Sequence, residues 1–433
     1  MVGYPVETPA ANPAAFAALA AAVGVPAIKP KRLIAGKTSP GRQLSDGTQQ
    51  VVTYRIKVYA PLDRDVSNFE LAFPNWYLAP AETAGANSIT VKAAFEYGFA
   101  GQPTALIPLY FNGARSAVIE AGATRLCDPA GFQMTKGTFG YLRVAVSVAS
   151  LGQFWPTGRA LVGGASELSW NSDQVDVLGT AGGSNGFTYM YGPAAIIGFG
   201  ENDNASVLIV GDSIAAGSVG EASGGDSQGN QGYVERALAN NLPWANTARG
   251  SDQFATFLAA HSRRLAYGPQ FATHAISEMG VNDIFIANRS LTVLQDMAIS
   301  TWKRLAGERM KVFQTTITPR TTSTDSWATL ANQTLFSVPQ EAVRVAFNDW
   351  IRAGAPIVAG AAVAIGTGGA VLAGAAGHPL TGFFEVADIA ESARNSGKWK
   401  VTGAANYATA DGTHPTTAMY LLLAGGITLA SLI

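Results

Sequence analysis

Two patterns of apolar and polar positions divide the chain. Between residues 50 and 148, short runs rich in Val, Ile, Thr, Tyr and Phe are bounded by Gly, Pro, Asn or Asp. Runs of this kind predict short β-strands joined by turns, as in a β-sandwich or a jelly roll. The clearest runs are QVVTYRIKVYA (50–60), NSITVKAAFEYG (87–98), TALIPLYF (104–111) and YLRVAVSVA (141–149).

From about residue 203 the pattern changes to apolar strands that alternate with amphipathic helices. Continuous apolar runs predict buried strands, and helical spacing predicts the segments between them. The strand candidates are 205–213, 272–280 and 310–319, and the helix candidates are 232–242, 291–307 and 340–354. Strands separated by helices indicate a parallel sheet that is covered on both faces. We therefore expect a β-rich domain over residues 1–200 and an α/β domain over 201–433.

Composition limits the kinds of function. Hydrophobic residues make up 48% of the 433 residues, charged residues make up 14%, and the net charge is -1. This is a globular composition without a basic run, so we expect no nucleic-acid partner. The single cysteine, Cys127, excludes an intrachain disulfide framework. A cytoplasmic protein and an extracellular or virion-associated one assembled in the cytosol both fit this cysteine content.

Two apolar stretches resemble targeting or membrane segments. Residues 14–25 are short and lack a basic flank, so we interpret them as a small helix and not as a signal peptide. Residues 353–377 are long enough to span a bilayer but consist mostly of Ala and Gly, with Pro356 near their start. We expect no membrane span there, but a tightly packed loop or a short-strand insertion.

The first motif with chemical content is VLIVGDSIAAG (207–217). An apolar strand ends in a glycine turn, and Ser213 follows where a helix can begin. This placement suits a nucleophile, because the hydroxyl is held at the sheet edge beside its own backbone N–H. The same residues also suit a simple turn with a helix cap. The neighbouring Asp212 is expected to hold the turn and not to react.

The second motif, MGVNDIF (279–285), ends another apolar strand. The amide of Asn282 can donate to an oxyanion, and Gly280 allows close approach of a substrate. A common Asn-Asp turn is the alternative interpretation. Asp283, like Asp212, is expected to be structural.

The third motif, DGTHPT (411–416), precedes a C-terminal apolar helix. The three-residue spacing lets the carboxylate of Asp411 reach Nδ1–H of His414, which leaves Nε2 free to take a serine proton. A surface histidine beside a helix cap is the alternative. Of the remaining histidines, His274 is expected in the core and His261 at the surface, and His378 has no acidic neighbour in sequence.

Taken together, GDSI (211–214), GVND (280–283) and DGTH (411–414) resemble blocks one, three and five of the SGNH, or GDSL-type, hydrolases. The resemblance covers about residues 203–433 and implies a three-layer, flavodoxin-like α/β/α fold. It implies Ser213 as nucleophile, His414 and Asp411 as the rest of a triad, and Asn282 in the oxyanion hole. ANTARGSDQ (245–253) is the best match to block two, which implies Gly250 as a further oxyanion donor. The chain departs from the family pattern in a Gly/Ala-rich insertion at about 355–380, which is expected to form one side of the pocket.

The resemblance implies a serine esterase without cofactor or metal. A β-domain ahead of such a hydrolase is similar to the arrangement in carbohydrate acetylesterases, so we expect O-deacetylation of a polysaccharide or surface glycan. The β-domain would then serve glycan engagement or assembly, and Trp76 and Tyr77 are candidates to stack on sugars or to fill its core. Two alternatives stay open: a short-chain lipid or aryl esterase, and a non-catalytic glycan-binding or phage structural module with a vestigial hydrolase domain. The sequence excludes clustered metal ligands and a P-loop, and GTGGAVLAG (366–374) lacks the setting of a dinucleotide site.

Overall fold

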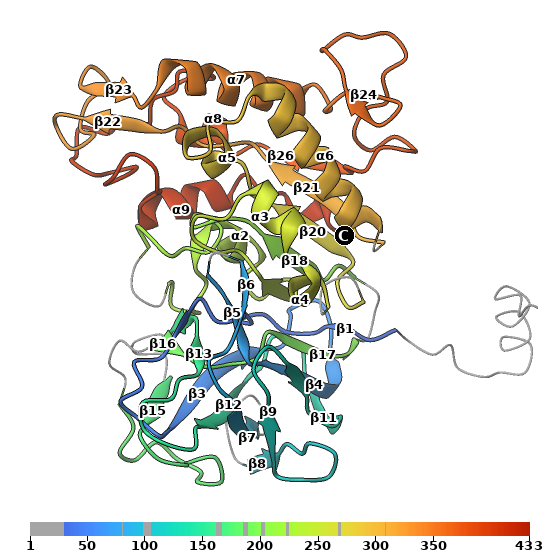
Figure 1. Ribbon diagram of the computed structural model, residues 1–433, viewed down its shortest axis with the longest axis vertical. Helices are drawn as coiled ribbons and strands as arrows, with labels where there is room; N and C mark the ends of the chain where they lie inside the picture. The colour runs from blue at the N-terminus through green and yellow to red at the C-terminus, as the bar shows by residue number, and fades with distance from the viewer. Residues whose placement is uncertain are drawn as a thin grey trace, which may run out of the picture.

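The structure, a computed structural model, has a β-rich part and a mixed α/β part stacked along its long axis (Figure 1). It describes residues 30–79, 81–97, 105–161, 167–184, 189–200, 204–221, 225–266, 270–307 and 309–433. The predicted small helix at 14–25 lies outside these residues.

Two antiparallel sheets form the β-rich part. One has the strand order β1-β17-β4-β10, with β11 also paired to β4, and the other has the order β15-β3-β12-β7-β8, with β9 also paired to β7. The first sheet comprises β1 (Arg32–Leu33), β4 (Val66–Pro74), β10 (Thr124–Leu126), β11 (Ala130–Met134) and β17 (Ala195–Gly200). The second comprises β3 (Val51–Tyr59), β7 (Ile89–Tyr97), β8 (Ala105–Pro108), β9 (Ser116–Ile119), β12 (Phe139–Ser147) and β15 (Leu168–Trp170).

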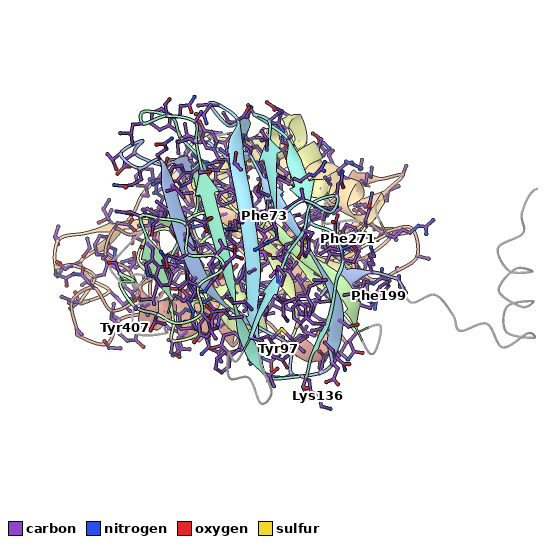
Figure 2. The ribbon with its side chains drawn as sticks, turned by 90° about the horizontal axis from the view of Figure 1, so that it is seen from below. Phe73, Tyr97, Lys136, Phe199, Phe271 and Tyr407 are labelled. Atoms are coloured by element: carbon purple, nitrogen blue, oxygen red, sulfur yellow. The ribbon has the colours of Figure 1, made fainter. Side chains whose placement is uncertain are left out.

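One apolar core lies between these sheets, because alternate side chains of each strand point inward. Phe69 and Phe73 on β4 share this core with Ile56 on β3 and Leu142 on β12. Figure 2 shows the strands of this part side by side, with Phe73 labelled among them. The strands predicted at 50–60, 87–98, 104–111 and 141–149 are found as β3, β7, β8 and β12. The jelly-roll connection remains a prediction.

Short pairs of strands complete the β-rich part. They are β2 (Gln43–Leu44) with β13 (Pro156–Thr157), β14 (Arg159–Ala160) with β16 (Tyr189–Met190), and β5 (Trp76–Leu78) with β6 (Glu82–Ala84). Trp76 is buried, and its indole N–H donates to Thr124 Oγ1 at 2.8 Å. Of the two interpretations of Trp76, the structure therefore supports the core residue and not the sugar platform.

The α/β part is built on a parallel sheet of order β19-β18-β20-β21-β26. Its strands are β18 (Val207–Val210), β19 (Trp244–Asn246), β20 (His274–Ser277), β21 (Lys311–Thr315) and β26 (Gly382–Phe384). In sequence order this is 2-1-3-4-5, the order of flavodoxin-like folds. The prediction of a flavodoxin-like parallel sheet is therefore confirmed.

Two groups of helices cover this sheet, and the helices of each group pack against one another. They are α2 (Gly232–Leu238), α3 (Phe254–Ala259), α4 (Ser262–Leu265), α5 (Val281–Phe285), α6 (Leu291–Gly307), α7 (Val338–Arg352), α8 (Ala387–Ala390) and α9 (Thr417–Ala424), followed by the 3-10 turn η2 (Leu429–Ser431). The helices α2 and α8 contact α9, whereas α6 contacts α3 and α7. Right-handed crossovers place α2 and α6 on opposite faces, because the chain winds in opposite directions from β18. The sheet thus reverses its winding between β18 and β20, and ligands of such folds bind beyond the carboxyl ends at that point.

The Gly/Ala-rich insertion forms a small hairpin of β24 (Ile357–Val358) and β25 (Ala361–Ala362). It projects on the side of the α/β part opposite α9 (Figure 1), and Lys303 on α6 donates to Gly360 O at 3.0 Å. Since α9 begins just after His414, the expectation that this segment walls the pocket is wrong. A second hairpin consists of β22 (Thr321–Ser323) and β23 (Gln333–Leu335). Across the described residues, no helix is long and apolar enough to cross a membrane.

Candidate active site

Ser213 lies in the turn that follows β18, at the carboxyl edge of the sheet. Asp212 Oδ1 accepts the N–H of Ile214 at 2.9 Å, and Asp212 O accepts the N–H of Ala216 at 3.0 Å. These bonds wind the chain directly after the strand and present the Ser213 hydroxyl beyond the sheet edge. Asp212 therefore shapes the turn, as expected.

A hydrogen-bonded relay connects Ser213 to residues far along the chain. Ser213 Oγ lies 2.8 Å from His414 Nε2, and His414 Nδ1 lies 2.6 Å from Asp411 Oδ2. With Asp411 ionised, Nδ1 carries the proton and Nε2 accepts from the serine hydroxyl. The structure thus brings together the three side chains that the sequence predicted as nucleophile, base and acid, and their catalytic roles stay a prediction.

The tight turn 411–414 sets this geometry locally. Asp411 Oδ1 accepts the backbone N–H groups of Thr413 and His414 at 2.9 and 2.8 Å, while Oδ2 faces the imidazole. Gly412 has φ +80°, and a Cβ there would collide with Thr321 O, so glycine is required. Burial opposes ionisation of Asp411, but the hydrogen bonds from the His414 ring and the backbone hold its pKa well below the usual value. Asp411 therefore stays a carboxylate at neutral pH.

Gly250 lies beside the nucleophile, in the loop after β19. The loop continues the strand pairing, because Thr247 N–H donates to Ile209 O and Arg249 N–H donates to Gly211 O at 2.9 and 3.0 Å. A Cβ on Gly250 would lie 4.0 Å from Ser213 Cβ. Among the described residues, neither the Ser213 nor the Gly250 backbone N–H has an acceptor, so both can serve a ligand.

Asn282 lies in the first turn of α5, after the neighbouring strand β20. Its Nδ2 donates to Asp252 O at 3.1 Å, which fixes the amide against the loop that carries Gly250. Asp283 Oδ2 joins the same loop by accepting the N–H of Phe254 at 3.1 Å. Burial raises the pKa of Asp283 to about 7. Asp283 therefore ties the Asn282 helix to the Gly250 loop.

Sequence reasoning missed Glu278, which is buried at the end of β20. Its Oε2 accepts the N–H of Asp212 at 3.0 Å and that of Ala215 at 3.4 Å, one on each side of Ser213. Burial, reinforced by the nearby Asp212, raises the pKa of Glu278 well above its usual value, and burial raises the pKa of Asp212 to about 7. The signal was an acidic residue inside an otherwise apolar strand segment.

The other three histidines have structural partners. His274 is buried in β20, as expected, and burial lowers its pKa to about 4. His261, which was expected at the surface, is half-buried. Its Nε2 accepts a hydrogen bond from Arg304 Nε at 2.8 Å. His378 Nε2 lies 2.8 Å from Ala355 O, within the Gly/Ala-rich insertion. In the part of the chain that the structure describes, no group of three His, Cys, Asp or Glu side chains is arranged to hold a metal ion.

No family model and no curated protein matches the chain. Several of the solved structures that match are GDSL-type lipolytic proteins, and each match covers about half of this chain. A GDSL-like lipase from Bacteroides thetaiotaomicron has 14% identity and a TM-score of 0.33, and the match covers 52% of this chain and 87% of that one.

Two further structures extend this comparison. A member of the lipolytic G-D-S-L family from Veillonella parvula has 18% identity and a TM-score of 0.33, and the match covers 51% of this chain and 94% of that one. The protein YXIM from Bacillus subtilis has 12% identity and a TM-score of 0.34, and the match covers 85% of this chain and 78% of that one.

Proposed function

We propose that this chain is a serine ester hydrolase that forms an acyl-enzyme on Ser213. The observation that carries the proposal is the relay from Ser213 Oγ through His414 to Asp411, at 2.8 and 2.6 Å. A serine hydroxyl alone is a weak nucleophile, and an aligned imidazole and carboxylate are what activate it. The relay also favours an enzyme over the non-catalytic module.

In the first half-reaction, Ser213 Oγ attacks the ester carbonyl carbon while His414 Nε2 takes the hydroxyl proton. Negative charge develops on the carbonyl oxygen, where the N–H groups of Ser213 and Gly250 and the amide of Asn282 would stabilise it. When the tetrahedral intermediate collapses, His414 gives its proton to the leaving alcohol. Asp411 stabilises the imidazolium throughout and does not itself take the proton.

The second half-reaction uses the same groups on water. His414 takes a proton from a water molecule, whose oxygen attacks the acyl carbon of the ester on Ser213. The second intermediate collapses with return of the proton to Ser213 Oγ and release of the carboxylic acid. These steps need no group beyond those on the chain and water.

For the substrate we propose a small acyl ester, with acetate on a polysaccharide or surface glycan as the best candidate. The chain beside the nucleophile reads AAGS at 215–218, and the histidine turn reads DGTHPT at 411–416. These small and polar residues offer little apolar area to a long acyl tail, for which each buried CH₂ is worth roughly 0.8 kcal/mol. The Gly/Ala-rich hairpin supplies no lid, since it lies away from α9.

The test of this proposal is kcat/KM across p-nitrophenyl acetate, butyrate, octanoate and palmitate, with acetate release from acetylated polysaccharides measured alongside. We expect the aryl series to decline from acetate onward and the polysaccharides to release acetate. A maximum at octanoate or beyond would contradict the small-acyl proposal and favour a lipid esterase. Fast aryl acetate turnover without acetate release from any polysaccharide would favour an aryl esterase.

A further inference from the structure

Arg320 lies between the histidine turn (411–414) and α5, the helix that carries Asn282. It follows β21, and the N–H of the next residue, Thr321, donates to Gly412 O at 3.0 Å, within the histidine turn. On its other side the guanidinium lies over the ring of Phe336, 3.9 Å from the centroid, and 5.8 Å from that of Phe285. Phe285 ends α5, the short helix that carries Asn282. Arg320 thus adjoins the histidine turn through its neighbour Thr321, and its guanidinium lies near the end of the Asn282 helix at Phe285.

The guanidinium of Arg320 keeps its hydrogen-bonding capacity. Among the described residues, no side chain or carbonyl accepts from it and no carboxylate lies within ion-pair distance, although the side chain is half-buried. Asp411 acts on it electrostatically, but the oxygens of Asp411 already accept from His414 and Thr413. A guanidinium carries five N–H donors in a planar fork. Arg320 therefore presents a cation with donors free to bind an anion.

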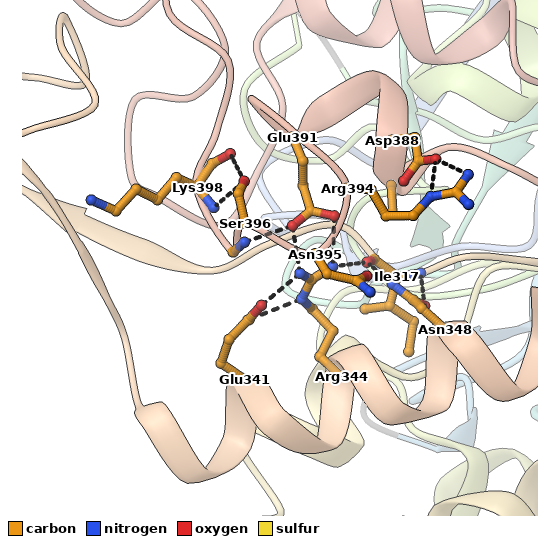
Figure 3. Close-up of polar contacts among 12 residues, drawn as sticks. Ile317, Glu341, Arg344, Asn348, Asp388, Glu391, Arg394, Asn395, Ser396 and Lys398 are labelled. Atoms are coloured by element: carbon orange, nitrogen blue, oxygen red, sulfur yellow. Dashed lines mark hydrogen bonds and ion pairs between the residues drawn. The ribbon is translucent and has the colours of Figure 1, made fainter.

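The backbone that leads to Arg320 is held rigidly by a buried network (Figure 3). Ile317 N–H donates to Asn348 Oδ1 at 2.8 Å, and Ile317 O accepts from Asn348 Nδ2 and Arg344 Nη1 at 2.9 and 2.8 Å. Arg344 is itself fixed by Glu341 and Glu391, each with an N···O distance of 2.6 Å. The segment that carries Arg320 is thus fixed before any ligand binds, which lowers the entropy lost on binding.

We propose that Arg320 binds a carboxylate on the alcohol portion of the substrate, so that the substrate is an ester of an acidic sugar. This inference rests on the proposed function, since it names the alcohol that His414 protonates. In the proposed mechanism His414 protonates the leaving oxygen, and Arg320 is tied to the His414 turn through the Thr321 N–H to Gly412 O hydrogen bond. Arginine suits a carboxylate because it can donate two parallel hydrogen bonds, and an aromatic face keeps its plane in place.

The experiment compares two substrates that differ in one group. They are a monoacetylated methyl glucuronoside and the monoacetylated methyl glucoside with the acetate at the same position. Acetate release gives kcat/KM for each, and the glucuronoside-to-glucoside ratio is the readout. It is measured for wild type, Arg320→Gln, Arg320→Lys and the control Arg309→Gln. Arg309 is exposed just before β21, at the amino edge of the sheet and away from the site.

We expect the wild type to prefer the glucuronoside, and Arg320→Gln to lower the ratio by about tenfold or more, as for a lost charge-assisted hydrogen bond. Arg320→Lys should keep part of the preference, and Arg309→Gln should keep all of it. Added NaCl should reduce the wild-type ratio. This salt effect tests the proposal on the wild type even where a variant fails to fold.

Other outcomes overturn the inference in distinguishable ways. A wild type without preference for the glucuronoside, or an unchanged ratio in folded Arg320→Gln, shows that Arg320 does not bind a substrate carboxylate. An equal loss on both substrates shows that Arg320 acts on Asp411 instead. If the wild type hydrolyses neither sugar nor p-nitrophenyl acetate, the proposed function itself fails. If p-nitrophenyl acetate turnover depends on Ser213 but the wild type does not prefer the glucuronoside, this inference fails and the proposed function stands.

Discussion

At the scale of single residues, hydrogen bonds fix the orientation of the polar side chains in the candidate site. Asn282 illustrates this, because one hydrogen of its amide is committed to Asp252 O at 3.1 Å. That bond orients the amide, which leaves its second N–H for a ligand. Asn282 is therefore proposed to act on the charge that develops in the transition state, and not to bind the neutral ester.

We predict that Asn282→Ala lowers kcat by about a hundredfold or more and changes KM little, because an oxyanion donor acts mainly in the transition state. The measurement is steady-state kinetics on p-nitrophenyl acetate, with circular dichroism to verify folding. A rise in KM with unchanged kcat would show that Asn282 is a ground-state contact.

The raised pKa of Asp283 predicts how the free energy of unfolding changes with pH. Burial raises the pKa of Asp283 to about 7 from the usual 3.8, so the folded chain keeps a proton that the unfolded chain has lost. The stability from this group is present below the unfolded pKa and is lost as pH rises through the folded pKa.

We therefore expect wild type to lose stability between pH 4 and 8 relative to Asp283→Asn, by about 2–4 kcal/mol, since each pKa unit corresponds to about 1.4 kcal/mol. Urea unfolding at several pH values measures this difference. Parallel pH profiles for the two proteins would show that Asp283 is not buried as a neutral acid.

The residues that sequence reasoning found and missed differ in one physical respect. Ser213 and Asn282 come shortly after apolar strands, and Asp411 and His414 stand in the turn before the apolar helix α9. In both settings a polar side chain is conspicuous and its spacing can be interpreted. Glu278 and Arg320 act through contacts made by folding, Glu278 with the turn after β18 and Arg320 with Phe336. No spacing along the chain encodes such contacts.

At the scale of elements, the turn that carries Ser213 is held by a side chain from the end of the neighbouring strand. Glu278, at the end of β20, accepts N–H groups on both sides of Ser213 in the turn after β18. Burial raises the pKa of Glu278 well above its usual value, which favours the protonated, neutral carboxyl group. An amide is then a close substitute for this side chain.

We predict that Glu278→Ala lowers kcat by roughly tenfold or more, since a small displacement of a nucleophile has effects of this size. Glu278→Gln should keep most of the activity, because its amide oxygen can accept the same N–H groups. Steady-state kinetics on p-nitrophenyl acetate distinguishes the two variants. Equal losses in both would mean that Glu278 does more than position the turn.

The limits of the helices and strands show how much the pattern of apolar and polar residues can predict. The helix predicted at 291–307 is found as α6 with the same limits, because an amphipathic stripe and a terminal glycine mark it. The helix predicted at 232–242 ends at Leu238, where the chain turns at Ala239 with φ +44°. The strand β4 was not predicted, although it pairs with β10, β11 and β17. Its pairing spans long distances in sequence, which local patterning does not reveal.

At the scale of the whole molecule, the β-rich part braces the α/β part without supplying a triad residue. Arg249, next to Gly250, donates to Leu78 O on β5, and Asn246 N–H donates to Thr38 O at 3.0 Å. Arg159 on β14 forms a buried ion pair with Glu235 on α2, with N···O distances of 2.6 and 2.9 Å. These contacts favour a supporting role for the β-rich part beside the glycan engagement or assembly that we propose for it.

We predict that Arg159→Ala lowers the free energy of unfolding by about 3–5 kcal/mol, because it leaves the carboxylate of Glu235 buried without its partner cation. Urea denaturation measures this effect. The matched control is Arg394→Ala, which breaks an ion pair on a 62% exposed arginine and should change stability little. Similar small effects for both variants would show that the Arg159 pair does not secure the contact between the two parts.

The central claim is that Ser213 is the nucleophile, and the most direct test is the turnover of p-nitrophenyl acetate by Ser213→Ala. We predict a fall in kcat of at least about a thousandfold with the fold intact, as for loss of a triad nucleophile. A folded Ser213→Ala protein with turnover close to that of the wild type would contradict the claim.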